Sequence, residues 1–365
     1  MVLNDQIAVD PVLYDLGNEY SVNDWQSETT SIASAVYRGF MENGRRFECE
    51  IAGAQLNIVN NKSTRYENLK QFTYAVAVDD KQFEAYECIH IVALLSEIRS
   101  DNPYFISPIG DSPKHILDLG TGKGTWAIEV ADRFPNTTVR GVDLFPPPVN
   151  WMPPNCVLEV DDVLQEWTWR DPFDLVHMRI LDSAFTPEES DRVYKQCYEN
   201  IRPGGWIEHL GPSMYVECDD GSVPTDSILF GFGDLISRAA EKMGRPINIC
   251  QTFRGAIEKA GFVDIQEKVY KWPIGPWPRD KLLKEIGALN FHHWSNGLEG
   301  YIMFVLTRFG EPVPWLKDEV LVYAAKIRSE LANPRHHAYH RATRIWARKP
   351  FTSEQNSVEI KSEQD

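Results

Sequence analysis

An aspartate and three glycines stand at alternate positions in one stretch of the chain: Asp118, Gly120, Gly122 and Gly124. Glycine has no side chain, so a glycine-rich turn lets its backbone N–H groups come close to a bound ligand. A carboxylate just before the turn would repel a pyrophosphate, but it suits a ligand that carries an ammonium or a sulfonium. The residue types and their spacing therefore predict a turn that binds a positively charged, nucleotide-like ligand.

Two well-known phosphate-binding loops do not match this stretch. A dinucleotide-binding fingerprint would place its third glycine where this chain has Thr125. A P-loop requires Gly-Lys followed by Ser or Thr, whereas Lys123 is followed by Gly124. The remaining structural alternative is a loop that uses its glycines only for tight packing.

The elements on either side of the turn favour ligand binding. An apolar run with one charge, His115 to Leu119, predicts a buried parallel strand. Apolar residues then recur at helical spacing after the glycines: Trp126, Ala127, Val130, Ala131 and Phe134. A strand, a glycine turn and a helix in this order place the N–H groups of the helix start toward the ligand.

Strands and helices continue to alternate along the chain, which predicts an α/β fold with a Rossmann-like, doubly wound parallel sheet of seven strands. The further strands are expected at 138–143, 156–160, 173–177, from 206 onward, 261–270 and 338–347. Helices are expected at 79–99, as an N-terminal helical extension, and at 187–201, 225–243 and 250–260. Ligands of such sheets bind at the carboxyl ends of the strands.

The chain is expected to contain one large domain with additions. Residues 1–70 read as a polar arm and extension, residues 71–350 as the domain, and residues 351–365 as a disordered acidic tail. Within the domain, residues 278–333 have a helical pattern and are expected to form a cap that is inserted before the last strand.

Composition excludes several classes of function. The net charge of −16 over 365 residues disfavours binding to nucleic acid or to anionic membranes. The sequence shows no apolar stretch of membrane-spanning length, and its polar N-terminus does not resemble a signal peptide. None of the six cysteines forms a C-x-x-C pair, so we expect reduced thiols, an intracellular location and no metal site.

The order of motifs resembles the fungal LaeA-like methyltransferases, which belong to the class I methyltransferases that use S-adenosylmethionine (SAM). The matching stretches are 42–46, 116–126, 142–143, 153–156, 161–163, 166–167, 173–174 with Arg179, 203–205, 219–221, 260–263, 276–278, 297–300 and 337–339. This chain departs from the family at Phe47, where the family has tyrosine, at Gln82 and Ala85, and in an extra segment at 48–70. The resemblance implies that residues 71–350 form a class I SAM methyltransferase domain.

Residues near the strand ends are candidates for binding SAM. Asp118, Gly120 and Gly122 are expected at its aminoacyl end, and Asp143, about twenty residues past the glycines, at its ribose hydroxyls. Asp162 is expected to face the adenine amine, with the backbone N–H of Val163 at the ring edge, and Asp161 is the alternative for this role. A strand-end acid can instead cap the helix that follows. The full set of expected cofactor-binding residues is Asp118, Gly120, Thr121, Gly122, Asp143, Leu144, Asp161, Asp162, Val163, His177 and Met178.

Methyl transfer from a sulfonium needs a base only when the acceptor is a hydroxyl or a protonated amine. Candidates for such a base are His177, His209, His292, His293 and Tyr339, each of which also fits an ordinary structural role. His292 and His293 are adjacent, so their side chains diverge on a helix and predict no metal site. Trp272, Trp277 and Trp294 are candidates either for the wall of an acceptor pocket or for the core.

These observations predict a SAM-dependent methyltransferase that acts on a small molecule, in fungal secondary metabolism according to the resemblance. The alternative is a LaeA-type nuclear regulator that works through protein partners, and a third possibility is a module that binds SAM without transferring a methyl group. Only Arg45 and Arg46 approach a basic nuclear signal, which favours the cytoplasm for the enzyme.

Overall fold

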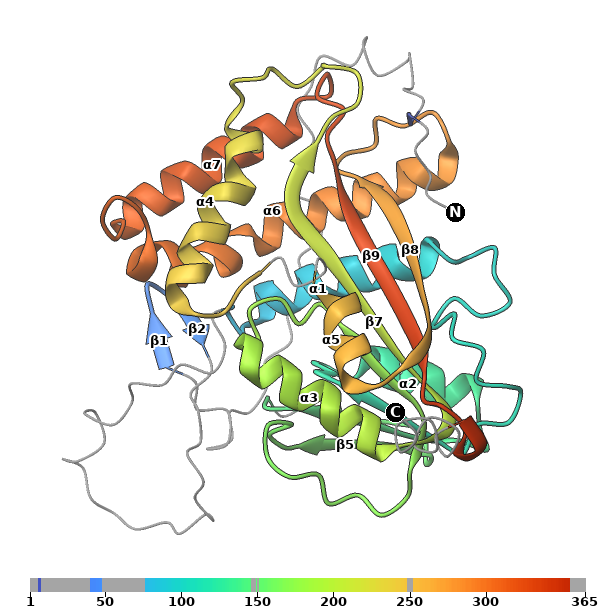
Figure 1. Cartoon of the computed structure of the whole chain (residues 1–365). Helices are drawn as coiled ribbons and strands as arrows, with labels where there is room; N and C mark the ends of the chain where they lie inside the picture. The colour runs from blue at the N-terminus through green and yellow to red at the C-terminus, as the bar shows by residue number, and fades with distance from the viewer. Residues whose placement is uncertain are drawn as a thin grey trace, which may run out of the picture.

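The computed structural model describes residues 6–7, 40–47, 76–145, 149, 151–247 and 252–354. A seven-stranded sheet with the strand order β5-β4-β3-β6-β7-β9-β8 forms its centre (Figure 1). The strands are β3 (His115–Leu119), β4 (Thr138–Asp143), β5 (Cys156–Val160), β6 (Phe173–Arg179), β7 (Ile201–Glu217), β8 (Val263–Pro273) and β9 (Tyr339–Arg348). All seven strands expected from the sequence are present.

The sheet is mixed rather than wholly parallel, which corrects one expectation. Strands β5, β4, β3, β6 and β7 pair in parallel, but β9 runs antiparallel to both β7 and β8. A parallel strand needs a crossover that returns the chain to the starting edge of the sheet. Here the helices between β8 and β9 bring the chain back to the edge of the sheet at which β8 ends. Strand β9 therefore starts at that edge and runs in the opposite direction.

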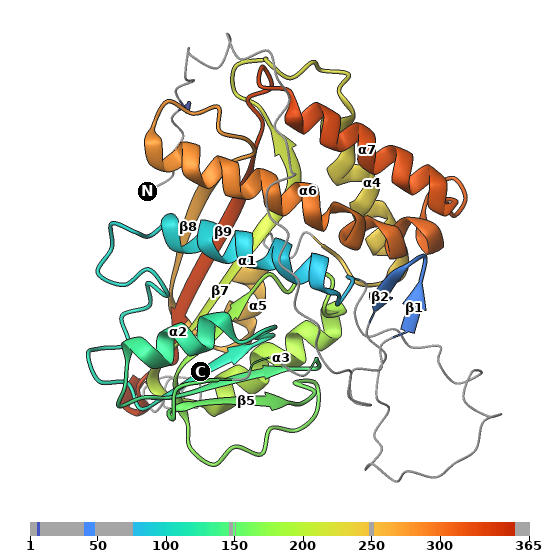
Figure 2. The same cartoon turned by 180° about the vertical axis from the view of Figure 1, so that it is seen from behind.

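Helices cover both faces of the sheet. The helices α1 (Asp80–Leu95) and α2 (Thr125–Arg133) lie on the face that is turned forward in Figure 2. The helices α3 (Pro187–Asn200) and α5 (Phe253–Ala260) lie on the opposite face, toward the viewer in Figure 1. Because side chains alternate along a strand, Ile116 packs in the cluster of α2, whereas Leu117 and Leu119 pack in the cluster of α3 and α5.

A helical cap extends the domain beyond one end of the sheet. It consists of α6 (Lys281–Phe309) and α7 (Lys317–Ala332), and α4 (Ile228–Met243) packs against both helices. Figure 1 shows the long strand β7 reaching up to these helices. Buried side chains of the three helices share one apolar cluster, which includes Phe232, Trp294, Leu298, Val320 and Ile327. The predicted insertion between the last two strands is therefore confirmed.

The N-terminal part contributes a short hairpin, β1 (Phe40–Glu42) and β2 (Arg45–Phe47). The side chain of Arg45 donates through Nε and Nη2 to the two carboxylate oxygens of Asp79, at 2.5 and 2.7 Å. Asp79 in turn caps the N-terminus of α1 by accepting from the N–H of Gln82. The motif around Gly44 thus fixes the start of the helix that precedes the sheet.

Several sequence-based expectations fall outside the described residues. The serine- and threonine-rich segment at 27–34, the extra segment at 48–70 and the end of the expected tail, 355–365, belong to this group. Residues 352–354 form a helical turn, which Arg348 holds by donating to both carboxylate oxygens of Glu354.

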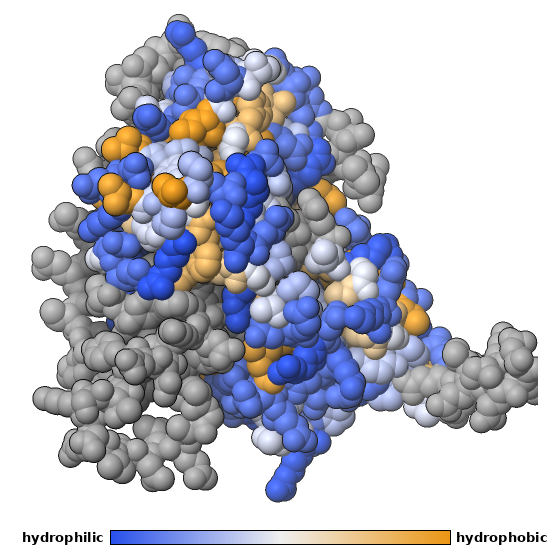
Figure 3. All heavy atoms as spheres, turned by 60° about the vertical axis from the view of Figure 1, so that its left-hand side comes forward, coloured by the Kyte–Doolittle hydropathy of each residue, from blue (hydrophilic) through white to orange (hydrophobic). Residues whose placement is uncertain are grey.

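On the face shown in Figure 3 the described surface is mainly hydrophilic, with small apolar areas. No helix among the described residues is long and apolar enough to cross a membrane.

Candidate active site

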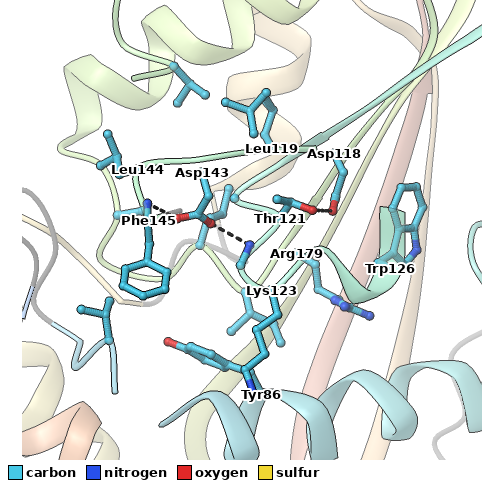
Figure 4. Close-up of a pocket in the computed structure, with 18 of the residues that line it drawn as sticks. Tyr86, Asp118, Leu119, Thr121, Lys123, Trp126, Asp143, Leu144, Phe145 and Arg179 are labelled. Atoms are coloured by element: carbon cyan, nitrogen blue, oxygen red, sulfur yellow. Dashed lines mark hydrogen bonds between the residues drawn. The ribbon is translucent and has the colours of Figure 1, made fainter. Parts of the chain in front are cut away.

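A cleft opens at the carboxyl ends of β3, β4 and β6, between the glycine turn and α1 (Figure 4). Its empty volume, which includes the open mouth, is about 1250 Å³. Residues from the glycine turn, from the ends of β4, β5 and β6, and from α1 line this space. The cleft therefore lies where the sequence predicted a ligand.

The three glycines of the turn have different surroundings. All three have left-handed backbones, with φ values of 71° at Gly120, 57° at Gly122 and 82° at Gly124. A Cβ atom would come within 2.4 Å of Leu181 at Gly120 and within 2.6 Å of Leu158 at Gly124, so these two glycines allow close packing. A Cβ atom at Gly122 would meet no described atom within 4 Å. Gly122 is therefore the glycine that leaves space for a ligand.

Asp118, on the strand that leads into the glycine turn, holds the turn in place through hydrogen bonds. One of its carboxylate oxygens accepts from Oγ1 of Thr121 at 2.7 Å, and the other accepts from Nδ1 of His177, also at 2.7 Å. The imidazole of His177 lies flat on the indole of Trp126, with ring centroids 3.8 Å apart. Burial lowers the pKa of His177. The neutral imidazole with its proton on Nδ1 therefore pairs with Asp118.

Asp143 connects the end of β4 to the turn. Its side chain accepts from the backbone N–H of Gly122 at 2.7 Å and from that of Phe145 at 2.9 Å (Figure 4). Burial raises the pKa of Asp143 to about 6, against the lowering effect of these N–H groups. Asp143 is thus fixed at the edge of the cleft next to Gly122.

The two acids that follow β5 differ in their contacts. Asp162 accepts from the N–H of Leu164 at 2.9 Å and from the side-chain amide of Gln165 at 3.0 Å, so it caps the turn that follows. Asp161 accepts from the N–H of Asp162 at 2.8 Å. Both acids line the cleft together with Val163. Asp162 therefore caps the turn after β5, a role close to the helix capping that the sequence left open for an acid at a strand end.

Five cleft residues from α1 and the glycine turn were absent from the sequence-based set: Phe83, Tyr86, Glu87, His90 and Lys123. Figure 4 shows Tyr86 projecting from α1 into the cleft. Glu87 accepts from Oγ1 of Thr125 at 2.8 Å. A helix contributes residues to this cleft only through tertiary packing, and the helical pattern of α1 gave no indication of which of its faces meets the glycine turn.

Arg179, a residue of one family motif, also reaches the cleft from the end of β6. Its Nη2 donates to Nδ1 of His90 at 2.8 Å, and because guanidinium only donates, the proton of His90 lies on Nε2. That Nε2 faces the carboxylate of Glu129 at 3.0 Å. Burial lowers the pKa of Arg179 to about 10, so the guanidinium remains charged at neutral pH.

The structure places His177 and Met178 away from the cleft, contrary to the expectation that they line the adenosine. His177 is buried against Trp126, and Met178 belongs to the apolar cluster on the other face of the sheet. The cleft is lined instead by the residues that follow them, Arg179 to Leu181. Strand β6 ends at Arg179, two residues later than predicted. The residues that follow the strand and line the cleft therefore come later in the sequence than expected.

Two of the candidate bases have structural contacts outside the cleft. His209 is stacked on Phe253 with centroids 3.9 Å apart and bonds through Nδ1 to the hydroxyl of Tyr194 at 2.8 Å. The hydroxyl of Tyr339 donates to Asp219 at 2.7 Å, near the distal end of β7. Neither residue lines the cleft. Both are therefore unsuitable as a base for chemistry at this site.

The adjacent histidines of α6 have different positions. His292 is half-buried and does not line the cleft, whereas His293 is buried and lines a second cavity beneath the cap. Of the three tryptophans considered for an acceptor pocket, only Trp294 lines that cavity. The indole N–H groups of Trp272 and Trp277 donate to Ser96 and to the carbonyl of Ala338. The described residues contain no cluster of three side chains that could hold a metal ion.

The strand order, the antiparallel β9 and the glycine turn above β3 define a class I methyltransferase fold. Comparison with known proteins identifies the family. Residues 83–266 match a family model described as "Methyltransferase domain". The chain is 31% identical over 329 residues to "Methyltransferase pytC" of Aspergillus terreus, and the match covers 90% of this chain and 93% of that protein.

A second relative carries a different name. The chain is 35% identical over 252 residues to "Secondary metabolism regulator LAE1" of Cochliobolus heterostrophus, with 67% of this chain and 80% of that protein covered. The chain therefore belongs to the fungal LaeA-like methyltransferase family. SAM, the cofactor expected from the sequence, is the cofactor of this domain.

Similar folds occur among solved structures. One is a phosphoethanolamine N-methyltransferase of Haemonchus contortus, which is 15% identical, with a TM-score of 0.42 and coverage of 74% of this chain and 57% of that chain.

Proposed function

We propose that this chain is an enzyme that transfers a methyl group from SAM to a small-molecule acceptor in fungal secondary metabolism. The observation that carries the proposal is the open face of Gly122 beside the fixed carboxylate of Asp143. A left-handed glycine with no described atom in front of it lets a ligand contact the backbone directly.

The charges around the cleft fit SAM. SAM carries a sulfonium, an ammonium and a carboxylate, so its site needs groups of both signs. Acids line the cleft at Glu87, Asp118 and Asp143, and cations line it at Lys123 and Arg179. A diphosphate would meet mainly carboxylates at this turn, which disfavours a dinucleotide.

We assign the nucleoside end of SAM to the side of the cleft next to β4 and β5. Asp143 would accept from the ribose hydroxyls, as expected from its place about twenty residues past the glycines. Leu144 and Val163 offer apolar contacts for the adenine ring, and Asp161 would accept from the adenine amine. Asp161 is preferred over Asp162, the first choice from the sequence, because Asp162 accepts two hydrogen bonds within its own turn, whereas Asp161 accepts one, from the N–H of Asp162.

We assign the amino-acid end to the side of the cleft next to α1 and β6. The charged guanidinium of Arg179 would pair with the carboxylate of SAM. Glu87, with Asp118 behind it, would attract the ammonium. His90 and Glu129 position Arg179, because His90 accepts one of its N–H groups and in turn donates to Glu129.

SAM supplies an electrophilic methyl group, and the thioether left after transfer needs no proton. The chain must hold the acceptor in line with the methyl group and exclude water, and such positioning lowers a barrier by several kcal/mol. An acceptor hydroxyl must also lose its proton to a base or to water.

Calorimetry tests the cofactor assignment directly. We expect the purified chain to bind SAM and S-adenosylhomocysteine, and not NAD. Tight binding of NAD without binding of SAM would overturn the proposal.

The regulatory alternative is favoured by the match to the LAE1 protein. Deletion of the gene followed by metabolite profiling separates the two functions. An enzyme predicts the loss of one compound and the accumulation of its demethylated precursor. A regulator, acting through protein partners in the nucleus, predicts a fall in the products of many pathways.

A further inference from the structure

A second cavity lies next to the cofactor cleft, under the helical cap. Six residues define this inner chamber: Ile180, Asp182, Phe232, His293, Trp294 and Tyr301. Its empty volume, which includes its open mouth, is about 650 Å³. Ile180 lines both the cleft and the inner chamber, so the two cavities are neighbours across the loop that follows β6.

The loop between the two cavities has an unusual backbone. Ile180 and Ser183 both adopt left-handed conformations, with φ values of 55° and 59°. A β-branched residue rarely adopts this conformation, and such strain persists where the surrounding structure enforces it, often at functional sites. As a result, Ile180 lines both cavities, whereas Asp182 lines the inner chamber but not the cleft.

Two buried polar atoms of the inner chamber have no hydrogen-bond partner among the described residues. They are Oδ1 of Asp182 and Nε1 of Trp294. Asp182 is 8% exposed and Trp294 is 4% exposed. A buried polar atom without a partner is costly, so a ligand that offers a hydroxyl or an amine to these atoms would remove the cost.

The ionisable groups of the inner chamber are uncharged at neutral pH. Burial raises the pKa of Asp182 to about 8, and burial lowers the pKa values of His293 and His340 to about 4 and about 3. The pKa of Tyr301 is also raised by burial. An anionic ligand would therefore lose its hydration in the inner chamber without gaining a counter-charge, and a cationic ligand would gain one only by ionising Asp182.

The remaining walls are apolar and aromatic. Phe232 and Ile236 come from α4, Val305 comes from α6, and Met214 comes from β7. The ring of Phe232 packs against that of Trp294 with centroids 5.4 Å apart. Such walls suit a flat apolar molecule.

We propose that the inner chamber binds the methyl acceptor, and that it selects an uncharged aromatic molecule whose hydroxyl pairs with Asp182 and Trp294. This inference rests on the proposed function for its chemistry. The acceptor oxygen would bond to the methyl carbon as the bond from that carbon to the sulfonium sulfur breaks, S-adenosylhomocysteine would leave as a thioether, and the hydroxyl proton would pass to water. The binding preference itself can be measured without turnover.

Four probes of similar size test this preference: naphthol, naphthalene, naphthoate and naphthylmethylamine. The first two are uncharged at neutral pH, the third is an anion and the fourth is a cation. Each would be titrated into the full chain saturated with S-adenosylhomocysteine, and the binding would be followed by calorimetry. We expect naphthol to bind most tightly and the two charged probes to bind at least tenfold more weakly than naphthol.

Variants then locate the binding. Trp294→Phe keeps the ring but removes the N–H group, and Asp182→Asn tests the carboxyl. We expect Trp294→Phe to weaken the binding of naphthol about tenfold and to leave the affinity for naphthalene unchanged. Trp315→Phe removes an indole N–H on the cap that lies outside both cavities and serves as the matched control.

Three outcomes would overturn the inference. Naphthoate or naphthylmethylamine could bind as tightly as naphthol, naphthol could fail to bind, or a folded Trp294→Phe protein could bind naphthol with unchanged affinity. Failure of the proposed function is distinguished by the titration with S-adenosylhomocysteine alone. A chain that binds naphthol but not S-adenosylhomocysteine would keep the inner chamber and lose the cofactor assignment.

Discussion

The carboxylate of Asp118 and the imidazole of His177 lie 2.7 Å apart and are both almost fully buried. The two residues face each other in register on β3 and β6, two adjacent parallel strands. Asp118 was expected from its sequence position to face the cofactor. In the structure Asp118 lines the cleft, and its carboxylate also holds the glycine turn through Thr121 and is itself held by His177.

Replacement of His177 tests this support. We expect His177→Phe to preserve the stacking on Trp126 but to leave the carboxylate of Asp118 short of one buried donor. The free energy of unfolding should fall by about 2–4 kcal/mol, as measured by urea denaturation. His177→Asn offers an N–H group near the same place and should recover part of the loss. Equal stability of the Phe variant and the original chain would show that the contact has no structural value.

Asp143 provides the test of the ribose assignment. We expect Asp143→Ala to weaken SAM binding by about 1–3 kcal/mol because hydrogen bonds to the ribose are lost. Calorimetry with S-adenosylhomocysteine gives the measurement. Asp162→Ala is the control, because that side chain accepts within its own turn and should affect affinity less. Unchanged affinity in Asp143→Ala would remove this residue from the cofactor site.

Arg179 is expected to recognise one end of the cofactor only. Arg179→Gln should weaken the binding of SAM by about 2–4 kcal/mol, because the carboxylate of SAM loses a charged partner. Methylthioadenosine lacks that carboxylate, and its affinity should be the same for both proteins. A parallel loss for both ligands would mean that the substitution disturbs the cleft as a whole.

His209 predicts a pH dependence of stability. Burial lowers the pKa of His209 to about 3, whereas the unfolded chain has the ordinary value near 6.5. The unfolded state therefore binds the extra proton as the pH falls below 6.5. The stabilising contribution of the neutral imidazole is complete above this pH and decreases by about 1.4 kcal/mol per pH unit as the pH falls toward 3.

The measurement is the difference in unfolding free energy between the original chain and His209→Gln. Other buried groups titrate alike in both proteins, so their effects cancel. From pH 7 to pH 5 the original chain should lose about 2 kcal/mol more than the variant. Parallel curves would contradict the buried neutral state of His209.

Arg45 links the N-terminal hairpin to α1. We expect Arg45→Ala to destabilise the chain by about 2–4 kcal/mol, because Asp79 loses a bidentate partner in a largely buried position. Arg45→Lys keeps the charge but not the two-pronged geometry and should recover only part of this loss. Thermal unfolding of the three proteins ranks them, and identical midpoints would exclude a structural role for the hairpin motif.

Local sequence was sufficient for the elements of the sheet and for the turn. The alternation of apolar strands and amphipathic helices predicted seven strands, and the spacing from Asp118 to Gly124 predicted a ligand-binding turn. Both features depend on neighbours within a few residues, which the sequence displays directly.

Tertiary structure decided which side chains meet at the site. Glu87 and His90 lie on α1 and reach the cleft only because that helix packs across the glycine turn. The burial of His177, the contacts of His209 and the position of Trp294 in the inner chamber depend on strands and helices that are distant in sequence. The sequence by itself determined the elements and the cofactor class, since their signals are local. Only the fold determined the polarity of the chamber, because burial and the loss of hydrogen-bond partners arise when distant segments pack together.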